Sequence, residues 1–178
     1  NGPKCGASAP DHLHLQAGTG THLPLRDNWE QLYSNRQTLL STPDGSELAA
    51  INNYACPAFA IVGRDAKADV TLFETLYKTL PQREDETEPM FNILKWREGE
   101  TYITVVIPRD KHRPACYSAE GDAQMLISPG ALDMAGLVIT PRKEDFERLN
   151  TPLLESLYKE VGMSTTTFED VKRKIMGV

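Results

Sequence analysis

Residues 90–107 read MFNILKWREGETYITVVI, and this stretch makes the clearest structural prediction in the chain. Two runs rich in β-branched and aromatic residues, Met90 to Trp96 and Thr101 to Ile107, flank a short turn around Glu98-Gly99-Glu100. Two such runs joined by a glycine-containing turn are typical of an antiparallel β-hairpin. The hairpin favours a mainly antiparallel sheet.

The segments on either side of the hairpin alternate between strand and helix patterns. A turn is expected at residues 42–46, a buried strand at 58–62, and shorter strands at 124–127 and 136–140. Helices are expected after Asp27, over 69–80, over 130–134, from Thr151, and from a capping box at Thr166 to Gly177. The pattern predicts an α+β fold, in which helices pack on a mainly antiparallel sheet and a helical tail ends the chain.

Composition narrows the class of protein. The 178 residues are 40% hydrophobic and 25% charged, with a net charge of −6. An acidic chain is a poor general nucleic-acid binder, and no apolar run is long enough to span a membrane. With no signal-peptide pattern at the start, the sequence predicts a cytoplasmic protein. Three widely spaced cysteines favour reduced thiols over a disulfide framework or a metal site.

A second pattern, near the start of the chain, contains the candidate catalytic residues. Residues 12–17, HLHLQA, alternate polar and apolar side chains, which predicts a strand with His12, His14 and Gln16 on one face. Two imidazoles on one face can reach one ligand, and Gln16 adds a neutral donor and acceptor. Upstream, Gly6 permits backbone amides to approach a phosphate closely. These groups suit covalent nucleotidyl transfer to an imidazole.

The stretch GASAPDHLHLQ, residues 6–16, resembles the His-x-His-x-Gln signature of the transferase branch of the histidine-triad (HIT) superfamily. That branch contains galactose-1-phosphate uridylyltransferase, the diadenosine tetraphosphate phosphorylases and the GDP-hexose phosphorylases, and the likeness is greatest to a bacterial HIT-like family without an assigned function. The resemblance implies a HIT-like fold with His14 as nucleophile, Gln16 on the phosphoryl oxygens and His12 in support. It also implies phosphate contacts at Gly6, Ala7 and Ser8, although three residues rather than two separate Ser8 from the first histidine.

A basic loop follows the second strand of the hairpin. Four potential cations occur within five residues, in an otherwise acidic chain: Arg109, Lys111, His112 and Arg113. They suit a phosphate or sugar-phosphate clamp, and the alternative is a solvated loop. Residues 107–114 and 128–136 resemble segments in the second half of duplicated HIT-like enzymes.

The resemblance implies three parts and a carboxy-terminal fragment. Residues 1–54 would end the catalytic half, 55–142 would form a second, non-catalytic half, and 143–178 would be the helical tail. The fragment expectation comes from an opening on Asn1-Gly2-Pro3 without an initiator methionine.

The predicted function is that of a nucleotidyltransferase or phosphorylase that forms a nucleotidyl-histidine. Its substrate would be a nucleoside diphosphate sugar or a dinucleoside polyphosphate, with phosphate as a partner. Two alternatives stay open: a HIT-type nucleotide hydrolase, and a nucleotide-binding module or inactive fragment without the upstream pocket. No residue cluster predicts a metal site, no cofactor is certain, and a divalent-metal requirement and homo-oligomerisation remain open.

Overall fold

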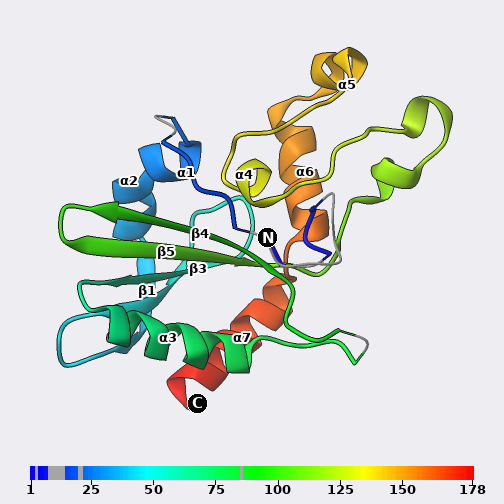
Figure 1. Cartoon of the computed structure of the whole chain (residues 1–178). Coiled ribbons are helices and arrows are strands. Elements are labelled where there is room, and N and C mark those ends of the chain that lie inside the picture. The colour runs from blue at the N-terminus through cyan, green and yellow to red at the C-terminus, as the bar shows by residue number, and fades with distance from the viewer. Residues whose placement is uncertain (3, 8–14, 20–21, 85) are drawn as a thin grey trace.

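The computed structural model describes residues 1–2, 4–7, 15–19, 22–84 and 86–178, and these form an α+β fold around one antiparallel sheet (Figure 1). The sheet order is β1-β2-β3-β5-β4. The strands are β1 (Arg36–Ser41), β2 (Glu47–Ile51), β3 (Ala58–Gly63), β4 (Phe91–Glu98) and β5 (Thr101–Pro108). The predicted fold class is confirmed.

The predicted β4–β5 hairpin is confirmed. Pairing runs without interruption from Phe91 opposite Pro108 to Glu98 opposite Thr101. β5 also pairs with β3, which in turn pairs with β2, so the hairpin is built into the sheet through β5. The predicted turn at 42–46 closes a second hairpin, between β1 and β2.

Alternation along the central strand β3 supplies a core on each face of the sheet. Phe59 and Ile61 join a cluster with α3 (Ala66–Thr79) and α7 (Thr165–Met176). Ala58 and Ala60 join a cluster with the other helices on the opposite face. Because side chains alternate across a strand, a continuous apolar run can bury both faces.

The remaining helices include α4 (Ala131–Met134), the one among them whose described residues line the candidate site. The others are α1 (Pro24–Asp27), α2 (Trp29–Ser34) and α6 (Thr151–Val161), and the short α5 (Lys143–Arg148) precedes α6. The 3₁₀ turns η1 (Ala115–Ser118) and η2 (Gly121–Ala123) lie in the long connection after β5. None of the helices in the described part of the chain is long and apolar enough to cross a membrane.

Helix starts follow local capping chemistry. The side chains of Asp65, Asn150 and Ser164 accept backbone N–H groups at the starts of α3, α6 and α7. Ser164 takes the cap that the sequence pattern placed at Thr166. Asp27 ends α1 instead of capping a helix, because Pro24 begins that turn.

Three predicted strand segments are not strands. Residues 124–127 and 136–140 have no strand pairing, because side-chain carboxylates take their backbone N–H groups: Asp145 accepts from Leu126 (3.0 Å) and Asp133 from Ile139 (2.7 Å). Residues 15–17, the described end of the histidine-containing segment, are also irregular. There Leu15 is 81% exposed instead of facing a core, because no neighbouring strand pairs with this segment.

Candidate functional site

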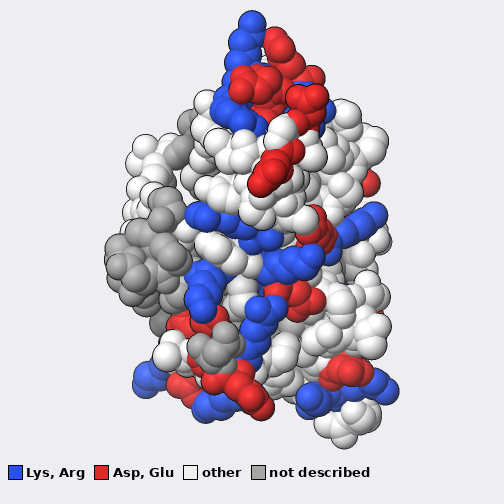
Figure 2. Space-filling model, turned by 90° about the vertical axis from the view of Figure 1, so that its right-hand side faces the viewer, with Lys and Arg blue, Asp and Glu red and all other residues white. Residues whose placement is uncertain are grey.

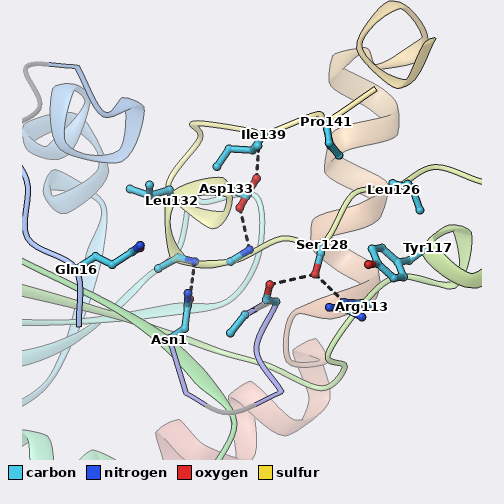
Figure 3. A pocket seen from close by; sticks show the side chains of 14 residues that line it. Asn1, Gln16, Arg113, Tyr117, Leu126, Ser128, Leu132, Asp133, Ile139 and Pro141 are labelled. Atoms are coloured by element: carbon cyan, nitrogen blue, oxygen red, sulfur yellow. Dashed lines mark hydrogen bonds between the residues drawn. The ribbon is translucent and has the colours of Figure 1, made fainter. Parts of the chain in front are cut away.

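A cavity of about 400 Å³ lies where the amino-terminal segment meets the connection between β5 and α5 (Figure 3). It brings together segments that are distant in sequence. Its lining residues are Asn1, Gly6, Ala7, Gln16, Arg113, Tyr117, Leu126, Ser128, Gly130, Ala131, Leu132, Asp133, Ile139 and Pro141. Polar groups and small apolar side chains share the walls, as in most small-molecule sites.

Gly6 sits against the cavity wall in a position that only glycine fits. Its φ is +80°, and a Cβ on it would lie 2.0 Å from the carbonyl oxygen of Pro129. Its N–H donates to Nδ1 of His112 (3.2 Å), and its carbonyl accepts from Oγ of Ser128 (3.1 Å). The amino-terminal segment is therefore fixed to both the basic loop and the Ser128 segment.

Arg113 is the cation of the basic loop that lines the cavity. Its Nε donates to Oγ of Ser128 (2.9 Å), and its guanidinium stacks on the ring of Tyr117, 4.1 Å from the centroid. Within the described residues, its two Nη groups have no hydrogen-bond partner. A partly exposed guanidinium held in this way can bind a phosphate oxygen through those donors.

Arg109 lies beneath the cavity and not in it. Its side chain is buried, and its guanidinium donates to five acceptors: the backbone carbonyls of Val161, Pro129, Lys111 and His112 and Oδ1 of Asn92. Burial lowers the pKa of Arg109 from its usual value. Through these hydrogen bonds, Arg109 fixes the conformation of the loop that contains Arg113.

One peptide group connects this buried cation with a buried carboxylate. The Pro129 carbonyl accepts from Arg109 (2.7 Å), and the Gly130 N–H donates to Asp133 (2.9 Å). Burial raises the pKa of Asp133, whose second oxygen accepts from Ile139. Oδ1 of Asn1 accepts from the N–H of Ala131 (2.7 Å) in the same wall. The wall on which Gly6 packs is therefore held from both sides.

The other predicted phosphate-binding residues divide between the cavity and the surface. Burial lowers the pKa of His112, and a neutral ring is consistent with Nδ1 accepting from Gly6. Lys111 points elsewhere and pairs with Glu160 (3.0 Å). Gln16 and Ala7 line the cavity. His12, His14 and Ser8 lie outside the described residues.

Tyr117, Ser128 and Asp133 belong to the site although sequence reasoning assigned them no role. For the segment 128–136 the sequence predicts a helical turn over 130–134 and shows a resemblance to HIT-like enzymes, and neither assigns a role to Ser128 or Asp133. Nothing in the sequence around Tyr117 indicated that Arg113 would stack on it.

The face of the molecule beside the cavity carries a local excess of cations. Lys4 pairs with Glu86 and Lys111 pairs with Glu160, whereas Arg83 and Arg113 have no carboxylate partner among the described residues. Figure 2 shows that Lys and Arg side chains gather across the middle of this face, with fewer acidic side chains between them. In a chain of net charge −6, such a cluster favours an anionic ligand. The described residues contain no group of three or more His, Cys, Asp or Glu side chains that could hold a metal ion.

The fold and the cavity define an α+β domain with a mixed polar and apolar site, in which Arg113 offers donors to a phosphate-bearing ligand. Comparison with known families makes this more specific: the family model described as "GDPGP1-like, C-terminal domain" matches residues 31–178, and the chain belongs to this family. A domain of unknown function (DUF4922) matches residues 1–19. The family is GDP-hexose phosphorylase-like, which confirms the expected phosphorylase branch at this coarse level.

No curated protein and no solved structure matched the chain.

Proposed function

We propose that this chain forms the phosphate-binding side of a nucleotide-sugar phosphorylase site of the GDP-hexose phosphorylase type, with His14 as the group that carries the nucleotide. The observation behind the proposal is one cavity that unites two separately predicted motifs. Gly6, Ala7 and Gln16 come from the first motif, and Arg113 comes from the basic loop. The bond from Gly6 to His112 joins residues 106 positions apart.

The proposed reaction has two displacements at the α-phosphorus of a nucleoside diphosphate sugar. In the first, an imidazole nitrogen of His14 forms a bond to phosphorus, the bond to the bridging oxygen breaks, and sugar 1-phosphate leaves. In the second, an oxygen of inorganic phosphate attacks the same phosphorus, the P–N bond breaks, and nucleoside diphosphate is released. The histidine is regenerated, so the two displacement steps balance.

The cavity residues have distinct parts in this scheme. The Gln16 side-chain amide donates to a non-bridging oxygen of the transferred group, where negative charge accumulates. The unpartnered Nη groups of Arg113 bind the attacking phosphate, and Ser128 and Tyr117 fix the orientation of that guanidinium. Gly6 packs directly against the Pro129–Gly130 peptide of this wall. A HIT-type hydrolase would use water in the second step, and a binding module would perform neither step.

Intact-mass measurement tests the covalent step directly. The protein is incubated with GDP-mannose, UDP-glucose or diadenosine tetraphosphate, and a nucleotide-sized, acid-labile adduct is expected. The adduct should be absent from His14→Ala and present in His22→Ala, a control histidine whose side chain is 89% exposed. No adduct on the unaltered protein, or an adduct that persists in His14→Ala, contradicts the proposal.

Product analysis then separates transfer to phosphate from hydrolysis. With inorganic phosphate present, the phosphorylase forms nucleoside diphosphate and sugar 1-phosphate. Nucleoside monophosphate as the main product, at the same rate with and without phosphate, would identify a hydrolase instead.

A further inference from the structure

We propose that a second pocket, of about 310 Å³, is a binding site for a neutral polyhydroxylated ligand, namely a free sugar or a polyol. The pocket lies between α1, α2 and the loop that follows β2. It shares no lining residue with the cavity described above. The inference does not depend on the proposed phosphorylase function.

Carboxamide side chains dominate the polar lining of this pocket. Asn28, Gln31 and Asn35 are spaced by three and then four positions along α2 and its two caps, so one side of the helix presents all three. Asn53 and Tyr54 contribute from the loop after β2. A carboxamide both donates and accepts hydrogen bonds, which matches the dual character of a hydroxyl group.

The bonds that these carboxamides already make leave much of their capacity unused. Nδ2 of Asn28 donates to the Pro24 carbonyl (2.9 Å), and Nδ2 of Asn35 donates to the Gln31 carbonyl (3.3 Å). Both bonds use donors and leave the side-chain oxygens available as acceptors. Among the described residues, the side chains of Gln31 and Asn53 have no hydrogen-bond partner. The pocket therefore offers acceptors from Asn28 and Asn35 and complete amides from Gln31 and Asn53.

The lining favours a neutral ligand over a charged one. Its described residues include no Lys, Arg, His, Asp or Glu, whereas the first cavity contains Arg113 and Asp133. A charged group would lose hydration without meeting an opposite charge. Leu32 supplies partly exposed apolar surface, Leu25 lies buried beneath it, and the Tyr54 ring is partly buried. Apolar surface ringed by amides suits a sugar, which has a C–H face and hydroxyls at its edge. The volume is at the small end of the range for ligand pockets.

The pocket is physically connected to the wall of the first cavity. The hydroxyl of Tyr54 donates to the carbonyl of Met134, and the N–H of Leu25 donates to the carbonyl of Ala135 (3.0 Å). Both acceptors are at the carboxyl end of α4, whose Leu132 and Asp133 line the first cavity. A ligand that contacts Tyr54 would therefore stabilise α4 as well.

Saturation-transfer NMR on the full chain tests the site with glucose, mannose and myo-inositol as probes. At least one probe should bind saturably, and Gln31→Ala combined with Asn53→Ala should weaken it by about tenfold, since two hydrogen-bonding side chains are removed. Both residues are exposed, so the double variant should fold. Glu30→Ala, a change on the same helix outside the pocket, is the matched control and should leave binding unchanged.

Two results would overturn this assignment. One is the absence of saturable binding by all three probes up to about 50 mM, a concentration well above the millimolar affinity range. The other is equal binding by the double variant and Glu30→Ala, which would place the sugar elsewhere on the protein.

Discussion

Substitution of Gly6 by alanine tests whether the amino-terminal segment is an integral wall of the candidate site. Alanine is unfavourable at position 6 for two reasons. The backbone has a φ of +80°, and the added Cβ would lie only 2.0 Å from the Pro129 carbonyl oxygen. Gly45 provides a matched control. Its φ is +86°, but a Cβ there would meet nothing within 4 Å. The pair separates the cost of the backbone conformation from the cost of the clash.

The expected magnitudes follow from these two geometries. A left-handed conformation costs a non-glycine residue about 1–2 kcal/mol, and Gly45→Ala should lose that much free energy of unfolding. Overpacking against a rigid peptide adds about 1–3 kcal/mol, which brings the expected loss for Gly6→Ala to about 2–5 kcal/mol. If residues 1–7 detach to relieve the clash, the loss is limited to the free energy with which that segment docks.

Urea unfolding followed by tryptophan fluorescence measures both losses, because Trp29 and Trp96 pack edge to face with centroids 5.2 Å apart in the core. The midpoint should fall further for Gly6→Ala than for Gly45→Ala. Nucleotide-adduct formation should fall in Gly6→Ala only, since that change displaces the cavity wall. Equal midpoints for the two variants would refute the argument that Gly6 packs on the Pro129–Gly130 peptide.

Three further changes test the charged residues around the site. Arg109→Met should lower the free energy of unfolding by about 3–5 kcal/mol, because buried acceptors including Asn92 lose their donor. Urea titrations measure this loss, and a value below about 1 kcal/mol would contradict the buried network. Arg113→Gln should raise KM for phosphate by about tenfold or more, because a charge-assisted hydrogen bond is lost. The exposed control Arg64→Gln should leave KM unchanged. Equal KM values for the two variants would show that Arg113 does not bind phosphate. The hydrogen bonds from Arg142 lower the pKa of Asp145 in the folded protein. The ionised carboxylate therefore stabilises the fold fully at pH values above its unfolded pKa of about 3.9. This stabilisation is lost as the pH falls through the lower pKa of the folded state. Asp145→Asn should therefore be less stable than the unaltered protein at pH 7, with a difference that shrinks in unfolding titrations taken down through that acidic range; a difference independent of pH would contradict the linkage.

Sequence patterns predicted the elements that depend on local periodicity. The β4–β5 hairpin, strand β3 and helices α3, α6 and α7 each have an apolar pattern that matches one backbone period over most of their length. The segments 124–127 and 136–140 have similar short apolar runs but are irregular, because Asp145 and Asp133 bind their backbone amides. A short apolar run does not show which acceptor its N–H groups will meet.

The candidate site was predictable in its residue types and less so in its arrangement. Gly6, Ala7, Gln16 and Arg113 were singled out from the sequence, and the structure places all four in one cavity. The roles of His12, His14 and Ser8 remain predictions, as does the division of the chain at 54 and 142. Ser128, Tyr117 and Asp133 entered the site only through contacts with distant segments.

The sequence by itself determined the antiparallel hairpin, the α+β class and the presence of cations in an acidic chain. Those properties follow from side-chain periodicity and composition, which act over a few residues. Only the tertiary structure decided that Arg109 is buried under the site while Arg113, four positions later, faces into it. Neighbouring arginines have the same local chemistry. Their roles differ because Arg109 meets three acceptors from distant segments and two from its own loop. Among the described residues, Arg113 meets one hydroxyl and an aromatic ring.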